Sequence, residues 1–290
     1  GRQHLSKTFG GKLALAFERY GQLCVGIDPH EELLLEWNLE VSASGVREFA
    51  DRVLEACVGR VGIIKPQVSF FERFGSKGFE ALEHLAQQAQ QSDLVVIMDA
   101  KRGDIGTTMA AYYEAWLGKQ ASMPCDALTV SPYLGFDSLK QVMSDSAERA
   151  KGLFVLAATS NPEGAALQKA TVSGSTLASD IWRRLGEINS ITAGPNDTLG
   201  SFGAVVGATL NLAGFGLGEI QAKRQQVATP ILAPGFGAQG AELGDISRLF
   251  GASADSVIAS VSRSVLRAGP SGLAQAIDSA KAELAAGLNS

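Results

Sequence analysis

The segment DAKRGDIGTT combines acidic and basic side chains at spacings that suit proton-transfer chemistry. Asp99 and Lys101 are two residues apart, so on extended backbone both side chains point to one side, and Asp104 follows at a predicted turn into a helix. In one cleft, such ammonium groups and carboxylates neutralise each other, and a lysine beside an acid keeps its proton. The cluster can then hold a proton donor in place while a carboxylate faces a substrate group whose charge changes. A structural ion-pair network is the alternative interpretation.

Two further charged residues occupy comparable positions in the chain. Asp28 in VGIDP and Lys65 in GIIKPQ each follow a short apolar run directly, as Asp99 does. If these runs are parallel strands of one barrel, their carboxyl ends meet at the same rim, where active sites lie. We therefore expect Asp28, Lys65, Asp99 and Lys101 to share one cleft.

A glycine-rich segment late in the chain suggests that the ligand carries a phosphate. APGFGAQG contains the pattern G-x-G-x-x-G at Gly235, Gly237 and Gly240. Dinucleotide-binding folds use this pattern, but too little chain follows it here to complete such a fold. In a barrel of strands and helices, a phosphate binds between the loops after strands 7 and 8. Arg263, just past the last apolar run, can place its guanidinium on phosphate oxygens, and Gln239 can add an amide donor. Glycines for tight packing and a surface arginine are the alternative.

The segment TSNP, at residues 159–162, follows the fifth apolar run. Hydroxyl and amide groups at a strand end suit the edge of a polar heterocycle, which makes Ser160 a candidate contact. A plain turn containing Asn-Pro explains the same residues equally well.

Eight short apolar runs, with helical patterns between them, are the elements that would position these residues. They are Leu23–Ile27, Val61–Ile64, Leu94–Met98, Ala127–Val130, Leu153–Ala157, Ala204–Val206, Ile231–Ala233 and Ser256–Ala259. Continuous apolar runs are typical of parallel strands buried on both faces. Eight strand–helix units predict an α/β fold, a (β/α)8 TIM barrel that forms a single domain over residues 1–290; a doubly wound open sheet is the competitor. We expect an additional N-terminal helix, roughly Leu5–Tyr20, to cap one end of the barrel, and the loose stretch Ala193–Gly200 to be an insertion.

The composition excludes several classes of protein. With 25 Lys and Arg against 30 Asp and Glu, a net charge of −5 and no basic block, the sequence argues against nucleic-acid binding. Three histidines and three cysteines, without a CxxC pair, leave too few residues for a zinc cluster or a Ser/His/Asp triad and favour reduced thiols. We see no signal peptide and no apolar run of membrane-spanning length, so we expect a cytoplasmic protein without a membrane partner.

The order of these motifs resembles the orotidine 5′-phosphate decarboxylase family, in its longer bacterial branch. VGIDP, IIKPQ, DAKRGDIGTT, TSNP, APGFGAQG and SRSVLRAG occur in the family's order and span nearly all eight units. DAKRGDIGTT is the most specific of them. The resemblance implies decarboxylation of orotidine 5′-phosphate to UMP, the last step of de novo pyrimidine synthesis, with neither a cofactor nor a metal.

The resemblance also implies a role for each matching residue. Asp28 and Lys65 match contacts to the ribose hydroxyls, and Lys65 also belongs to the charged cluster. Asp99 matches the carboxylate beside the substrate carboxyl group, and Lys101 matches the acid that protonates C6. Asp104, Ile105 and Thr108 match residues that reach across a homodimer interface into the neighbouring site. Of these three, Asp104 is also a candidate catalytic residue. Ser160 matches the pyrimidine contact, and Gln239 and Arg263 match the phosphate contacts. The chain departs from the family pattern in the segment 160–203, which is longer than in compact members of the family.

Three other functions compete with this interpretation. Sugar-phosphate lyases of the same superfamily share DxKxxD but use a divalent metal and place an acid on the second strand, where this chain has Lys65. A Schiff-base aldolase needs a neutral lysine, which neighbouring Asp99 and Asp104 disfavour. A non-catalytic nucleotide-binding barrel would bind UMP without turnover.

Overall fold

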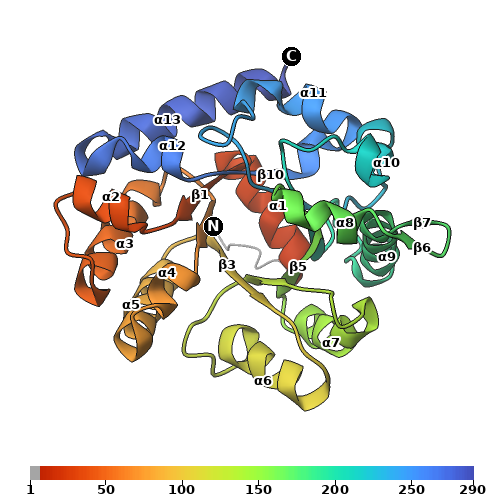
Figure 1. The fold of residues 1–290 in the computed structure, drawn as a ribbon, viewed down its shortest axis with the longest axis horizontal. Coiled ribbons are helices and arrows are strands. Elements are labelled where there is room, and N and C mark those ends of the chain that lie inside the picture. The colour runs from red at the N-terminus through yellow and green to blue at the C-terminus, as the bar shows by residue number, and fades with distance from the viewer. Residues whose placement is uncertain (1–6) are drawn as a thin grey trace.

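Eight parallel strands close into a barrel, surrounded by helices (Figure 1), in the computed structural model, which describes residues 7–290. The barrel strands are β1 (Leu23–Ile27), β2 (Ile63–Pro66), β3 (Val95–Arg102), β4 (Ala127–Val130), β5 (Gly152–Ala158), β8 (Phe202–Val206), β9 (Ile231–Ala233) and β10 (Val257–Val261). Their order around the barrel is β1-β10-β9-β8-β5-β4-β3-β2. The predicted (β/α)8 barrel is therefore confirmed, and the open doubly wound sheet is excluded. Each of the eight apolar runs overlaps one of these strands.

Helices follow the strands on the outside of the barrel. The α-helices between barrel strands are α2 (Glu31–Glu36), α3 (Ala43–Cys57), α4 (Ser69–Glu72), α5 (Gly75–Gln90), α6 (Gly106–Leu117), α7 (Lys140–Glu148), α8 (Ala165–Gln168), α9 (Leu177–Thr192), α10 (Gly218–Ala222) and α11 (Ile246–Phe250); α12 (Arg263–Leu266) and α13 (Gly269–Leu288) follow the last strand. Short 3-10 turns are η1 (Phe136–Leu139), η2 (Pro162–Gly164), η3 (Ala213–Phe215), η4 (Leu243–Asp245) and η5 (Gly251–Ser256). The apolar faces of these helices and the outward side chains of the strands form the larger of two hydrophobic clusters.

The smaller cluster fills the barrel interior and extends onto helix α1 (Phe9–Tyr20). Phe9 packs edge-on against Phe154 of β5, with 6.0 Å between the ring centroids, and the N–H of Gly10 donates to the Ser201 hydroxyl just before β8. Both contacts lie at the amino ends of barrel strands, so α1 caps that end as predicted. The helix ends at Tyr20 as expected, but it begins at Phe9, with Thr8 as its N-cap, and not near Leu5, which itself lies outside the described residues. Because the strands are parallel, their carboxyl ends lie together at the opposite end of the barrel.

The extra chain between β5 and β8 lies elsewhere than the sequence suggested. The prediction placed an insertion at Ala193–Gly200, but this stretch only links α9 to β8. The additional residues instead form η2, α8 and a hairpin of β6 (Thr171–Val172) and β7 (Ser175–Thr176). The prediction was wrong because it relied on the turn-rich composition of residues 193–200. The additional helix and strands are too short to give a periodic pattern in the sequence.

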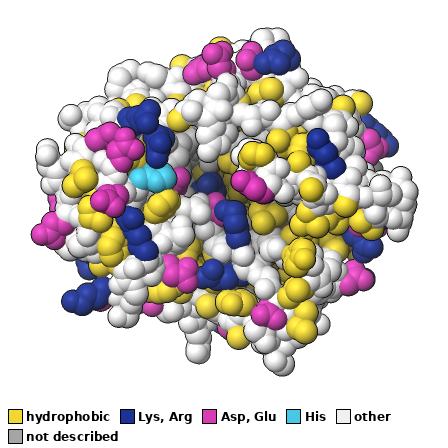
Figure 2. All heavy atoms as spheres, in the orientation of Figure 1, with side chains coloured by type: hydrophobic (Ala, Val, Ile, Leu, Met, Phe, Trp, Pro, Cys, Tyr) yellow, Lys and Arg dark blue, Asp and Glu magenta, His cyan; other side chains and the backbone are white. Residues whose placement is uncertain are grey.

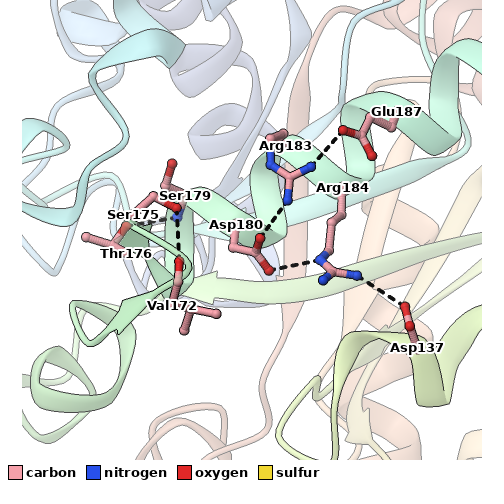
Figure 3. A network of polar contacts seen from close by, with 9 residues as sticks. All are labelled: Asp137, Val172, Ser175, Thr176, Ser179, Asp180, Arg183, Arg184 and Glu187. Carbon is pink, nitrogen blue, oxygen red and sulfur yellow. Dashed lines mark hydrogen bonds and ion pairs between the residues drawn. The ribbon is translucent and has the colours of Figure 1, made fainter.

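An ion-pair network fixes helix α9 beside the barrel (Figure 3). The buried carboxylate of Asp180 accepts from Arg183 at 2.7 Å and from Arg184 at 2.9 Å, and Arg184 also reaches Asp137 of η1 at 3.2 Å. Thr176 caps the helix by accepting from the N–H of Ser179 at 3.0 Å. The network therefore ties α9 to the loop after β4.

Among the described residues, no helix combines the length and apolar character that crossing a membrane requires.

Candidate active site

Strand pairing brings the predicted charged residues to one rim of the barrel. Gly26 of β1 pairs with Lys65 of β2, and Gln67, two residues beyond Lys65, forms a bridge with Asp99 of β3. Lys65 is 6% exposed and Asp99 is 8% exposed, so both charged groups are almost fully withdrawn from water. Acidic and basic side chains gather around the hollow at the centre of the ring of helices (Figure 2).

Asp99 is the centre of an arrangement that we call the charged array, composed of Lys65, Asp99 and Lys101. One carboxylate oxygen, Oδ2, lies 3.4 Å from the Lys65 ammonium, and the other, Oδ1, lies 2.6 Å from the Lys101 ammonium. Oδ1 also accepts a hydrogen bond of 2.9 Å from the hydroxyl of Thr129 on β4. Two cations thus share one carboxylate, and the array carries a net positive charge.

Asp99 and Lys65 of the charged array stay ionised in spite of their burial. Burial opposes ionisation of Asp99, but the ammonium groups of Lys65 and Lys101, with the hydrogen bonds from Lys101 and Thr129, hold its pKa below the usual range. Burial likewise opposes protonation of Lys65, yet the charges of Asp99 and Asp28 hold the pKa of that lysine well above its usual value. A protonated Lys65 argues against the Schiff-base aldolase, which needs a neutral amine.

Lys101 does not adopt the extended conformation that the sequence predicted. Its φ is +52°, in the left-handed region that side chains other than glycine rarely occupy. The pairing of β3 with β4 shifts between Met98 and Arg102, so the strand bulges at this residue. Because of the bulge, the Lys101 ammonium folds onto Asp99 while 45% of the side chain stays exposed to the open end of the barrel. A charge-bearing side chain that remains reachable from the cleft is suited to proton donation.

Asp104 and Ile105 lie in the loop after β3, and Thr108 lies on α6. Asp104 accepts from the N–H of Ile105 at 2.8 Å, and no ion pair involves Asp104 within residues 7–290. Ile105 is 60% exposed, and Thr108 is exposed on the first turn of α6. The three residues predicted to act across an interface are therefore accessible.

The predicted phosphate loop contacts the segment that carries Arg263. Gly235, Gly237 and Gly240 all have positive φ, of 109°, 79° and 110° respectively, which explains why glycine occupies these positions. A Cβ on Gly237 would lie 2.4 Å from the Ser264 hydroxyl, so this loop and the start of α12 touch closely. Arg263 is half-buried, and no carboxylate within residues 7–290 forms an ion pair with it.

The backbone of the phosphate loop is partly occupied by its own hydrogen bonds. The N–H groups of Gly237 and Gly240 donate to Ala241 and Gly237 carbonyls respectively. Gln239 is exposed, and its amide oxygen lies 3.5 Å from the point where a Cβ of Gly235 would stand. An anion here would therefore meet the Gln239 and Arg263 side chains, whereas Gly237 and Gly240 chiefly shape the turn.

Ser160 lies beyond the carboxyl end of β5 and is exposed. A Cβ on Gly207, just past β8, would lie 3.3 Å from the Ser160 Cβ, so Ser160 lies beside the end of the next barrel strand. Gln168 of α8 holds this segment by accepting from the N–H of Thr159 at 2.8 Å. This hydrogen bond connects the segment that carries Ser160 to helix α8 of the insertion.

The sequence analysis missed two polar residues of the site. Thr129 contacts Asp99 and Lys101, although it stands inside an apolar strand run. Ser262 faces Asp28 across Gly26, and the Ser262 hydroxyl and the Asp28 Oδ1 atom are buried without a hydrogen-bond partner among the described residues. Such orphaned polar atoms suit a ligand with hydroxyl groups. A polar residue within a buried strand was the available signal for Thr129; none distinguished Ser262 from a turn serine.

In the part of the chain that the structure describes, no group of three or more His, Cys, Asp or Glu side chains is arranged to hold a metal ion.

Comparison with known proteins gives a consistent result over nearly the whole chain. Curated orotidine 5′-phosphate decarboxylases from Streptomyces coelicolor and Salinispora arenicola are 48% and 45% identical to this chain, over 91% of each chain. A solved structure from Streptomyces avermitilis, described as an orotidine 5′-phosphate decarboxylase, matches with a TM-score of 0.90 and 44% identity, covering 100% of this chain and 99% of that one. The model of the orotidine 5′-phosphate decarboxylase / HUMPS family matches residues 21–277, and the chain belongs to this family.

Proposed function

We propose that this protein decarboxylates orotidine 5′-phosphate to UMP and CO2 in pyrimidine biosynthesis, and that Lys101 protonates C6. The observation that carries the proposal is the Lys65–Asp99–Lys101 array at the carboxyl rim of the barrel. Family membership and the relatives named as orotidine 5′-phosphate decarboxylases support the reaction. The residues described below account for binding and chemistry without a cofactor.

Substrate binding divides between a phosphate end and a reacting end. Arg263, which has no carboxylate partner within residues 7–290, can bind phosphate oxygens together with the Gln239 amide. Asp28 and Lys65 can hold the ribose hydroxyls, and the Asp28 Oδ1 atom, which has no hydrogen-bond partner within residues 7–290, supplies an acceptor. Ser160 would contact the pyrimidine. The free energy of phosphate binding can then help to position the pyrimidine of the substrate at the charged array.

At the reacting end, the substrate carboxylate would lie beside Asp99. The bond between C6 and the carboxyl carbon breaks, CO2 leaves without the bonding pair, and that pair stays on C6. A proton moves from Lys101 Nζ to C6, and the neutral amine regains a proton from solvent. The fixed ammonium stabilises the developing carbanion more than the ground state, which is the condition for catalysis. Repulsion by Asp99 raises the energy of the bound carboxylate.

We also propose a homodimer in which Asp104, Ile105 and Thr108 of one chain reach the site of the other. Exposed apolar side chains on consecutive elements of this rim support it: Ile105, Tyr112, Tyr133, Leu134 and Leu167. Tyr133 and Leu167 also line a groove of about 460 Å³ after β4 and β5. Exposed apolar side chains beside a groove are typical of an interface.

The shared site has a direct test in mixed dimers. Lys101→Ala and Asp104→Ala chains should each be inactive alone, whereas an equal mixture should recover about a quarter of the wild-type rate, because half the dimers are hybrid and one of their two sites is intact. A mixture as inactive as its components would contradict the shared site.

We also propose three further features of the protein, which its composition and fold support. Free, buried Cys24, Cys57 and Cys125 support a reducing, cytoplasmic location. A net charge of −5 disfavours a nucleic-acid partner. The barrel and its additional helices would act as a single domain over residues 1–290.

A spectrophotometric assay with orotidine 5′-phosphate and excess chelator tests the reaction. Wild-type protein should turn over under these conditions, whereas loss of activity that Mg²⁺ restores would favour the metal-dependent lyase. Lys101→Ala should lose at least about a thousandfold in kcat, within the range for general acid catalysis, while still binding UMP. Lys151→Ala, at the opposite end of the barrel, is the matched control. A Lys101→Ala protein with more than about a tenth of the wild-type rate would refute the assigned role.

A further inference from the structure

Thr129 joins the two reacting groups of the charged array through one hydroxyl. Its Oγ1 donates to Asp99 Oδ1 at 2.9 Å and accepts from the backbone N–H of Lys101 at 3.0 Å. The residue is 1% exposed, so water cannot replace either bond. The Thr129 side chain therefore contacts both the carboxylate of Asp99 and the backbone of Lys101, the proposed proton donor.

Strand register explains why a side chain is needed at this point. Met98 pairs with Leu128 and Arg102 pairs with Val130, so on β3 three residues, 99 to 101, stand opposite a single residue of β4, Thr129. A regular ladder would supply a backbone carbonyl for the N–H of Lys101, but the bulge removes that partner. The Thr129 hydroxyl takes its place.

The bulge also holds one residue in a strained backbone conformation. Lys101 has φ +52°, and a residue other than glycine persists in that region only when its surroundings hold it there. The hydrogen bond from Lys101 N to Thr129 is such a restraint. The 2.6 Å contact between Lys101 Nζ and Asp99 depends on this backbone position, because the two residues are only two apart.

We propose that Thr129 is a positioning residue that fixes Lys101 and Asp99 relative to each other for proton transfer to C6. The inference rests on the proposed decarboxylase function and goes beyond it, since Thr129 needs no contact with substrate. Displacement of a catalytic group by about 1 Å can cost about a hundredfold in rate. Loss of the hydroxyl should therefore lower kcat and leave the remote phosphate grip unaffected.

The test compares Thr129→Val, Thr129→Ser and wild type in steady-state assays with orotidine 5′-phosphate. Valine has nearly the same shape but can neither donate nor accept, so kcat should fall about 10- to 100-fold, the range seen for supporting hydrogen bonds, with KM changed less than about threefold. Serine keeps the hydroxyl and should hold kcat within about threefold of wild type. Competitive inhibition by UMP should be alike in all three.

Thr229→Val is the matched control. Thr229 is 0% exposed and accepts from Asn189 at 3.2 Å, at the amino end of β9. Removing its hydroxyl creates a similar buried defect far from the array, so kcat should stay near the wild-type value. If Thr129→Val does not fold, Thr129→Ala against Thr129→Ser makes the same comparison.

The outcomes separate the two proposals. An active wild type with Thr129→Val above about a third of its kcat would overturn the positioning role alone, as would equal losses in kcat for the serine and valine variants. A wild type without turnover would overturn the decarboxylase function and this inference with it.

Discussion

Replacing Asp99 with asparagine removes the charge that contacts both Lys65 and Lys101. Lys65 is the more sensitive partner, because its side chain is 8% exposed and its ammonium would be left buried with Asp28 as the nearest opposite charge. Lys101 has 45% of its side chain exposed, so it can turn to solvent. The substitution keeps the volume of the residue and changes the charge.

The size of the effect follows from these exposures. Breaking a buried ion pair by removing one partner costs about 3–5 kcal/mol, and the charge of Asp28 brings the expected cost for Asp99→Asn to the lower end, about 3 kcal/mol. Lys101→Ala leaves Asp99 with Lys65 and Thr129, so that variant should lose about 1 kcal/mol or less. We therefore expect stability and catalysis to separate: Asp99→Asn should be the less stable variant, whereas Lys101→Ala should stay folded and lose its activity.

Urea unfolding followed by circular dichroism measures the difference, with equal m-values as the requirement for comparing midpoints. In Lys65→Met/Asp99→Asn, both charges are gone, so the double variant should be more stable than Asp99→Asn alone, with a coupling energy of at least about 1 kcal/mol. If Asp99→Asn matched the wild-type midpoint, or if Lys101→Ala lost as much stability, the buried-charge argument would be refuted.

The pH dependence of this difference has a definite sign. The folded-state pKa of Asp99 lies below its usual value, so the stability it contributes is present above the unfolded-state pKa, about 3.9, and is lost as pH falls through the folded-state pKa. The folded-state pKa of Lys65 is raised, so its contribution is complete below about pH 10. The gap between wild type and Asp99→Asn should therefore stay constant from about pH 5 to 9 and narrow below about pH 4.

Three further predictions concern other parts of the molecule. Arg263→Ala should weaken competitive inhibition by UMP about 10- to 100-fold and barely alter inhibition by uridine, which lacks the phosphate; equal losses for both ligands would exclude a phosphate contact. Burial raises the pKa of Cys24 and that of Cys125 to about 12, so a thiol reagent at pH 8 should label the cysteines only after denaturation, and rapid labelling of the native protein would contradict their burial. Asp180→Ala should lower stability by about 1–2 kcal/mol in thermal unfolding with kcat within about twofold, and an unchanged melting temperature would show that the α9 network contributes nothing.

The barrel could be predicted because its signal is local and repeated. Each apolar run records burial on both faces of one strand, and parallel connections allow few ways to join eight of them. Once a barrel is predicted, Asp28, Lys65 and Asp99 are expected to lie close together, because the carboxyl ends of all barrel strands lie at the same rim. This prediction requires no knowledge of contacts between particular residues.

The role of Thr129 could not be predicted in the same way. The run ALTV indicates a buried strand, but the register between β3 and β4, which places Thr129 opposite the bulge, is a property of two strands together. The left-handed backbone of Lys101 was hidden for the same reason: its sequence neighbours favour an extended chain, and only the shifted pairing makes the bulge visible.

Asp99 has different effects on the charged array without and with substrate. Without substrate, one carboxylate neutralises one of two ammonium charges, and the array is stable because Lys65 and Thr129 complete the environment of Asp99. A bound substrate would add a second carboxylate beside Asp99, and the repulsion between the two is relieved when that group leaves as CO2. In the proposed reaction, the ammonium of Lys101 would then face a carbanion, while Lys65 would continue to neutralise Asp99. Lys65 would thus have an electrostatic role besides any ribose contact, because it would leave the charge of Lys101 available to the reacting carbon.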